Sequence, residues 1–291
     1  SGPLLFILYT NDVVNYIPEN NDIYTSADDT ATIIYSKTLT GLELQAQLCL
    51  DNISKYCHLN KLKLNVGKTK CILFKQPPII RQELSISCDN IVGEIVDSYK
   101  YLGFKIDYKL NLNLVAEKLI SNLNSCAGVL NKCKYFLSKH QMTLLLNSIG
   151  LTYINYYAIV IYNLPKMMFH KVERSYNHCY SVLHNCHMNK LCEINTFTPL
   201  AIFIKFTLLK YLWKIINSNF CPPLKSILFE NQQITPYSVR NSDNISIKRF
   251  SSNTGHKSFN YWAPKLWNEV PISIRQSTTL NMFLKVLKNH I

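Results

Sequence analysis

The sequence lacks the features of an exported or membrane-bound protein. No charged and then apolar leader follows Ser1, and the most apolar later stretch, residues 144–164, is interrupted by asparagines and tyrosines. The ten cysteines include no CxxC pair, and a chain of 291 residues does not need disulfides to fold. We therefore expect a soluble chain, incomplete at its N-terminus, with reduced thiols. Its expected location is intracellular, in the nucleus or cytoplasm, with no membrane contact and no secretion.

Basic residues are missing from the start of the chain. Residues 1–36 contain five acidic residues and neither Lys nor Arg. Residues 37–108 carry ten basic and seven acidic residues, and residues 109–291 carry twenty-one against six, within a total net charge of +13. An acidic region followed by a basic expanse suits a protein that binds metal ions and phosphates. A solvated basic surface, or a compositional bias towards Lys, explains the total charge equally well.

Two adjacent acids, Asp28 and Asp29, lie between two runs of β-branched and aromatic residues. This pattern over residues 23–35 predicts a β-hairpin that carries both carboxylates at its turn. Adjacent like charges repel, so a bound cation would stabilise the pair. A solvated Asp-Asp turn is the alternative interpretation, because Asp is an ordinary turn residue.

Four segments, in this order, resemble the reverse transcriptases of non-LTR retrotransposons of the jockey-like and LINE-like kind. They are SGPLLFILYTND at residues 1–12, ADDT at 27–30, LNVGKTK at 64–70 and YKYLG at 99–103. The run YWAPKLWNEVP at residues 261–271 is similar to the tail of many such polyproteins. The resemblance therefore covers most of the chain and implies an RNA-directed DNA polymerase.

The resemblance also implies roles for individual residues. Asp28 matches the metal-binding aspartate, and Asp29 its neighbour in the motif, with Mg²⁺ or Mn²⁺ as the expected cofactor. Lys68 or Lys70 would face the nucleotide triphosphate, although a solvated turn lysine is as good an interpretation of either. The segment from Tyr101 to Gly103 would position the primer end; without the family context it is a buried strand. The expected partners are an RNA template and a DNA primer.

The sequence departs from the family pattern in two ways. Ser26 replaces the aromatic residue that usually precedes Ala-Asp-Asp, which removes a packing group beside the nucleotide. The second metal-binding aspartate of the palm belongs to a strand upstream of residue 1, so we expect this chain alone to be inactive and the missing upstream part of the polyprotein to be a partner.

The expected fold is α/β (α+β), with a partial polymerase palm over residues 1–110. A helical, thumb-like bundle is expected over 111–220, and a loop-rich C-terminal region with a final helix over 221–291. Apolar spacing predicts helices over 40–60, 141–162, 171–188 and 200–217, the first with a capping box from Thr40. Cys221-Pro222-Pro223 is interpreted as a linker.

A second group of possible ligands combines histidines with cysteines. Such a group suggests zinc, but its spacing fits no common zinc site, which favours core cysteines and surface histidines. Its members are His178, Cys179, His184, Cys186, His187 and Cys192.

Two further functions stay open beside the polymerase. A non-catalytic protein could bind nucleic acid through lysines that lie near aromatic residues. The helical region could instead be a protein-interaction module. The lysines and aromatics of the first alternative are Lys132, Lys134, Tyr135, Lys205, Phe206, Lys210, Tyr211, Trp213 and Lys214.

Overall fold

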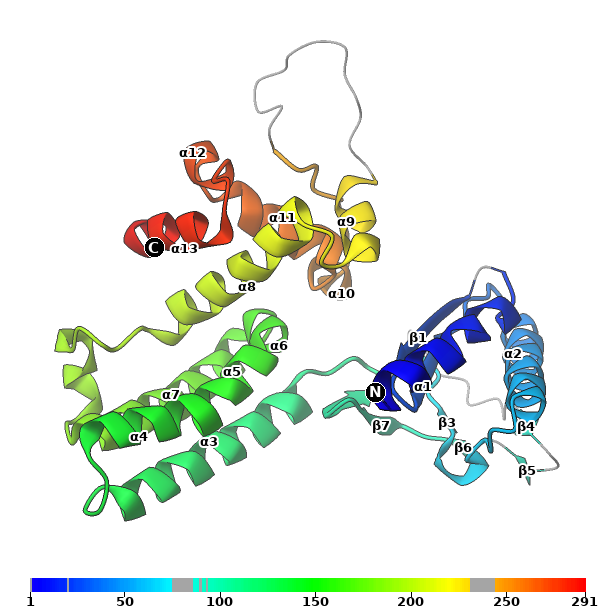
Figure 1. Cartoon of the computed structure of the whole chain (residues 1–291), viewed down its shortest axis with the longest axis horizontal. Helices are drawn as coiled ribbons and strands as arrows, with labels where there is room; N and C mark the ends of the chain where they lie inside the picture. The colour runs from blue at the N-terminus through cyan, green and yellow to red at the C-terminus, as the bar shows by residue number, and fades with distance from the viewer. Residues whose placement is uncertain (1, 20, 75–85, 89–90, 93, 231–243) are drawn as a thin grey trace, which may run out of the picture. The chain divides into compact units, whose positions relative to one another are not determined.

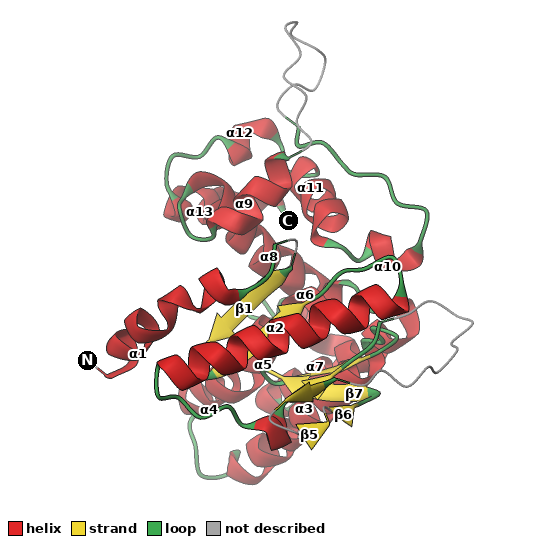
Figure 2. Ribbon diagram, turned by 90° about the vertical axis from the view of Figure 1, so that its right-hand side faces the viewer, coloured by secondary structure: helices red, strands yellow, loops and turns green. Residues whose placement is uncertain are grey.

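The chain divides into two compact units, Ser1–Lys109 and Leu110–Ile291. The computed structural model describes residues 2–19, 21–74, 86–88, 91–92, 94–230 and 244–291, with the backbone alone at 88, 91 and 92. The described residues are mostly helical, and their strands all belong to the first unit (Figure 1, Figure 2). The structure is consistent with the expected α+β class.

The N-terminal unit combines one short and one long helix, α1 and α2, with short strands. Its elements are α1 (Gly2–Thr10), η1 (Asn11–Tyr16), β1 (Asp22–Ser26), β2 (Asp29–Ile33), α2 (Leu39–Leu59), η2 (Val66–Lys68), β3 (Lys70–Cys71), β4 (Ser87–Cys88), β5 (Ile91–Val92), β6 (Glu94–Ile95), β7 (Ser98–Tyr101) and β8 (Phe104–Asp107).

The described strands form four separate pairs. The pairs β1–β2, β4–β5 and β7–β8 are antiparallel, whereas β3–β6 is parallel. The sequence predicted an α/β layer with strands backed by helices. Within the described ranges the strands are instead ribbons, because the pairs other than β1–β2 and β7–β8 are only two residues long. The apolar composition of residues 84–88 also predicts a strand, part of which lies outside the described residues.

The N-cap of α2 lies two residues earlier than predicted, at Thr38 instead of Thr40. Thr38 has an extended backbone, and its hydroxyl oxygen accepts a hydrogen bond from the N–H of Gly41 at 3.1 Å. Thr40 therefore lies inside the helix, and the predicted capping box from Thr40 is wrong. The remainder of the prediction is confirmed, since α2 ends at Leu59 with Asn60 as its C-cap.

A buried tyrosine attaches the N-terminal segment to α2. The hydroxyl of Tyr56 donates to Asp12 Oδ1 at 2.9 Å and contacts the carbonyl oxygen of Tyr9 at 3.1 Å. Burial and this hydrogen bond raise the pKa of Tyr56 to about 12. The ring of Tyr16 packs edge-on against the ring of Tyr56, with centroids 5.0 Å apart. Helix α1 itself buries none of its residues.

The C-terminal unit is built from helices. Its elements are α3 (Asn113–Cys133), α4 (Lys139–Leu145), η3 (Leu146–Leu151), α5 (Thr152–Tyr156), α6 (Ala158–Tyr162), α7 (Lys166–His184), η4 (Met188–Glu193), α8 (Leu200–Asn217), α9 (Pro222–Phe229), α10 (Asn253–His256), α11 (Phe259–Asn268), α12 (Ile272–Arg275) and α13 (Leu280–His290).

Helices α3 and α7 pack side by side and form much of the core of this unit (Figure 1). Apolar residues at helical spacing predict a helix here, and this apolar face of α3 is buried at Leu119, Leu123, Cys126 and Leu130. Helix α7 begins at Lys166 rather than at the predicted residue 171, directly after Pro165, and ends where Asn185 adopts a left-handed backbone at φ 49°. The helix predicted over 200–217 is confirmed as α8.

The single helix predicted over 141–162 is broken into four pieces. Ser138 and Gln141 form a complete capping box at the start of α4. The following π-helical segment η3 contains Gly150, and the hydroxyl of Thr152 donates to the carbonyl oxygen of Ser148 at 2.8 Å. Apolar periodicity does not reveal such a break. A π-helical insertion changes the register of a helix by one residue but removes none of its apolar side chains.

The last part of the chain contains more helix than its composition indicates. The predicted linker at Cys221 is instead the N-cap of α9, whose first two positions are prolines, where the missing N–H groups have no intrahelical partner. The predicted final helix is present as α13. Between them, α11 buries both Trp262 and Trp267.

Candidate nucleic-acid and metal site

Asp28 and Asp29 lie at the tip of the β1–β2 ribbon. Ser26 pairs with Asp29, so the chain reverses through Ala27 and Asp28, and Ala27 adopts a left-handed backbone at φ 54°. Both aspartates are exposed to solvent. The predicted hairpin with both carboxylates at its turn is confirmed, while the catalytic and metal-binding roles of these residues stay predictions.

The two carboxylates supply the oxygen ligands that Mg²⁺ prefers, but they are few. Among the described residues, no group of three or more His, Cys, Asp or Glu side chains is arranged to hold a metal ion. The carboxylate oxygens at the tip therefore suit a divalent cation, but two aspartates are too few protein ligands to complete its coordination. Any ion bound there would keep most of its water ligands.

A second hairpin brings Tyr101 to the ribbon. The hydroxyl of Tyr101, at the end of β7, lies 3.5 Å from the carbonyl oxygen of Tyr24 in β1. Partial burial raises the pKa of Tyr101, and the negative charge of Asp29 raises it further. The structure therefore places Tyr101 within the electrostatic influence of Asp29 at the acidic tip, although the two residues are far apart in the sequence.

The segment from Tyr101 to Gly103 is the last residue of β7 and the turn after it, not the buried strand of the alternative interpretation. Tyr101 pairs with Phe104, and both intervening residues have positive φ, 46° at Leu102 and 82° at Gly103. Leu102 is exposed. Two successive left-handed residues suit the tight turn of a two-residue hairpin, and glycine takes this backbone without strain.

The two candidate lysines have different surroundings. Lys70 lies in β3, and its ammonium group forms an ion pair with Glu94 of β6. Lys68 closes η2 and is exposed, and its N–H is capped by the side chain of Asn65 at 3.2 Å. The hydroxyl of Tyr99 donates to the carbonyl oxygen of Lys68 at 3.2 Å, so strand β7 contacts both the Lys68 turn and the ribbon. Lys68 is the better candidate for an anionic ligand.

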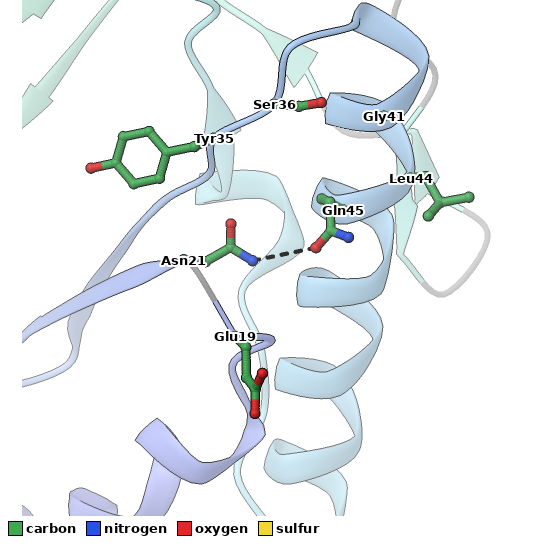
Figure 3. Close-up of a pocket in the computed structure, with 7 residues that line it drawn as sticks. All are labelled: Glu19, Asn21, Tyr35, Ser36, Gly41, Leu44 and Gln45. Atoms are coloured by element: carbon green, nitrogen blue, oxygen red, sulfur yellow. Dashed lines mark hydrogen bonds between the residues drawn. The ribbon is translucent and has the colours of Figure 1, made fainter.

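A small groove in this unit lies at the opposite end of the ribbon from Asp28. It is lined by residues that precede β1 or follow β2 and by residues of α2, and the amide of Asn21 donates to Gln45 Oε1 at 3.4 Å across it (Figure 3). The exposed hydroxyl of Tyr35 donates to Asp22 Oδ2 at 2.8 Å nearby. This groove shares no residue with the candidate site and was not anticipated from the sequence.

The histidine and cysteine group of the C-terminal unit is dispersed. Cys179 is buried and its thiol donates to the carbonyl oxygen of Leu123 at 3.3 Å. His184 stacks on Tyr180, and burial together with the charge of Lys139 lowers the pKa of His184. In the described part of the chain these ligands do not form a group of three around one point.

The basic and aromatic residues singled out in the sequence fall into two sets. On α8, Trp213 is buried against Phe283, whereas Lys205 is exposed and pairs with Glu269 at 3.3 Å, so the aromatic ring belongs to the core and the lysine is neutralised by an acid. At the end of α3, Tyr135 is exposed and the Nζ of Lys134 lies 5.0 Å from its ring centroid. Its neighbour Phe136, which the sequence reasoning missed, is also exposed.

Within the described ranges, no helix combines the length and the apolar character required to span a membrane. Comparison of the chain with protein-family models, with curated proteins and with solved structures returns no match. The residues and their geometry therefore carry the functional argument alone.

Proposed function

We propose that this chain is the later part of the palm, followed by the thumb, of a non-LTR retrotransposon reverse transcriptase, an RNA-directed DNA polymerase. The contact between the Tyr101 hairpin and the Asp28–Asp29 ribbon is the observation that supports it most. Two segments that match the family motifs in sequence lie against each other in space, as a common active site requires.

The proposed roles follow from the chemistry of each side chain. Asp28 would hold Mg²⁺ or Mn²⁺, which activates the primer hydroxyl and neutralises the phosphates when bound. Asp29 would support Asp28 and fix the electrostatic environment of Tyr101. Lys68, which is exposed, would face the triphosphate, whereas Lys70 is held by Glu94. The turn at Gly103 would position the primer end.

Helix α1 supports the idea that the palm continues beyond these residues. Leu4, Leu5, Ile7 and Leu8 are each more than half exposed, although they lie in one short helix. An apolar helix with no buried residue is typical of an element that packs against a further part of its domain. Together with the incomplete ligand set at the tip, this exposure favours a polypeptide that does not polymerise DNA by itself.

Primer extension with Mg²⁺ or Mn²⁺ tests the proposal. Residues 1–291 alone should extend no primer, and addition of an upstream palm half encoded by the same locus should restore extension. Asp28→Ala should then abolish incorporation, while Asp51→Ala, a change of an exposed acid on α2, should leave it intact. Extension that survives Asp28→Ala would refute the assigned role of the ribbon.

A non-catalytic nucleic-acid-binding protein is the second candidate, favoured by the exposed Lys134–Tyr135 pair. Both candidates predict binding to an RNA–DNA duplex that weakens as salt rises, because phosphate contacts release counterions. Binding without restored extension would favour the second candidate. The absence of any salt-dependent binding would favour a protein-interaction module.

A further inference from the structure

Two aromatic side chains stand out from the end of α3. Tyr135 is 81% exposed and Phe136 is 86% exposed, more than any other large apolar side chain of the described residues. They lie in the turn that joins α3 to α4 at one end of the helical unit (Figure 1). Two aromatic rings held in water have no stabilising role in the fold, so their exposure points to a ligand.

The backbone holds this turn in a fixed conformation. The N–H groups of Phe136 and Leu137 both donate to the carbonyl oxygen of Cys133, at 2.9 Å and 3.0 Å. Directly after the turn, Ser138 and Gln141 form the capping box of α4. Because hydrogen bonds fix the chain on both sides, the aromatic rings are presented on a rigid support, which lowers the entropic cost of binding.

The surroundings of the two rings are basic. Lys132, Lys134 and Lys139 lie within eight residues of one another, with no acidic residue between them. Over residues 117–193, from α3 to η4, there are eight basic residues and three acids, of which Glu173 pairs with His170 at 3.2 Å. This excess of positive charge attracts a polyanion.

A shallow groove adjoins the aromatic turn. It is lined by Asn131 and Lys134 of the α3 end and by Ser181, Val182, Asn185, Cys186 and His187 of the α7 end. Lys134 therefore contributes both to the groove and to the stack on Tyr135. Amide, hydroxyl and imidazole groups are the side chains that form hydrogen bonds with base edges.

We infer that the aromatic turn and this groove, together the α3–α7 tip, bind single-stranded nucleic acid. Bases would stack on Tyr135 and Phe136, the lysines would contact phosphates, and the groove would receive the edge of a base. A single strand is favoured over a duplex because only unpaired, unstacked bases offer their faces to aromatic side chains. The inference goes beyond the polymerase proposal, since it depends neither on Asp28 nor on catalysis.

Fluorescence anisotropy on the full chain tests the inference with labelled (dT)12, (U)12 and a twelve-base-pair RNA–DNA duplex. The double variant Tyr135→Ala/Phe136→Ala should raise the Kd for both single strands by about 10-fold or more, as expected for lost stacking. The Kd for the duplex should change much less. Lys132→Gln/Lys134→Gln should reduce the slope of log K against log salt by about 1.4 for a single strand.

A matched control is provided by the Lys214–Phe220 pair. It has the same cation–π chemistry, with 5.4 Å between Nζ and the ring centroid and a Phe220 side chain that is 57% exposed. Phe220→Ala, which leaves Lys214 in place, should leave single-strand binding within about 2-fold. An equal loss in Phe220→Ala and in Tyr135→Ala/Phe136→Ala would overturn the inference, because it would show that binding is spread over any exposed aromatic residue beside a lysine.

Unchanged oligonucleotide binding by Tyr135→Ala/Phe136→Ala would also overturn it. If the same variant reduced self-association in sedimentation, the tip would be an interface between copies of this chain instead. Circular dichroism of each variant should match that of the parent chain. Of the side chains changed in the tip variants, Lys132, Tyr135 and Phe136 are exposed and Lys134 is half-buried. Failure of primer extension would leave this inference intact.

Discussion

The hydroxyl of Tyr101 lies 3.5 Å from the carbonyl oxygen of Tyr24, a contact that joins two hairpins 77 residues apart in sequence. The negative charge of Asp29 contributes to the raised pKa of Tyr101. The arrangement of the two hairpins can therefore be measured through one titrating group.

Asp29→Asn should lower the pKa of Tyr101 towards its ordinary value. Removal of the negative charge makes the tyrosinate easier to form, while the contribution of burial stays. NMR of ¹³C-labelled tyrosine checks the shift, with Asp28→Asn as the matched control because Asp28 does not contribute to the raised pKa. Equal effects of the two substitutions would show that the hairpins are arranged differently.

Tyr56→Phe should destabilise the N-terminal unit by about 1–2 kcal/mol, because the buried hydroxyl holds Asp12 and the carbonyl of Tyr9. Urea unfolding near neutral pH measures the loss. Tyr211→Phe, which removes an exposed hydroxyl from α8, is the control and should change the free energy of unfolding little. A similar loss in both variants would contradict this prediction.

Stability should also fall in alkaline solution in a way that depends on Tyr56. Its folded pKa of about 12 exceeds the ordinary value of 10.0, so the folded state holds the proton more tightly. The stabilisation is complete below pH 10 and is lost as the pH rises towards 12, where the folded hydroxyl also ionises. Unfolding of the parent chain should be more pH-dependent in this range than unfolding of Tyr56→Phe. Parallel curves would argue against the raised pKa.

Gly150→Ala and Gly128→Ala should have opposite effects on the helical unit. A Cβ at Gly150 would lie 2.8 Å from Leu146 Cδ1 and 3.2 Å from Cys126 Sγ, both buried, and overpacking of this kind costs about 1–3 kcal/mol. Gly128 is exposed on α3 with nothing within 4 Å of the added Cβ. Alanine there should stabilise the helix by up to about 1 kcal/mol. Thermal unfolding measures both changes, and a stabilising Gly150→Ala would contradict the close packing of η3 against α3.

Asn268→Ala should destabilise the C-terminal part by about 1–3 kcal/mol. The Asn268 amide donates from Nδ2 to the carbonyl oxygen of Ile245 at 2.9 Å, and its Oδ1 accepts from the N–H of Ile245 at 3.0 Å. Loss of both bonds leaves partly buried backbone groups unpaired. Asn289→Ala, an exposed change in α13, is the control, and proteolysis of the segment after residue 243 should increase in Asn268→Ala alone.

The elements that sequence reasoning located well are those whose signal is local. The β1–β2 ribbon was predicted because Ala-Asp-Asp interrupts two strand-forming runs, and α8 because its apolar residues recur at helical spacing. The four-part break over residues 139–162 was missed, since the close approach of Gly150 to Cys126 depends on tertiary packing.

The candidate site was predicted in part. Its acids were placed at a turn by local pattern, but the ion pair that occupies Lys70 depends on Glu94, which lies 24 residues away. The exposure of Phe136 could not be inferred, because an aromatic residue after an apolar helix is normally part of a core. The tail motif at residues 261–271 contributes two buried tryptophans and the hydrogen-bonding side chain of Asn268. In this chain it therefore stabilises the fold of the C-terminal unit.

The exposed aliphatic side chains of α1 should make the self-association of this chain depend on protein concentration. Each square ångström of such surface that is covered gains about 25 cal/mol, so any partner that shelters α1 is favoured. In dilute solution the exposed side of α1 is in contact with solvent alone. At high protein concentration it can contact other copies of the chain. Self-association of the chain through α1 should therefore increase with protein concentration.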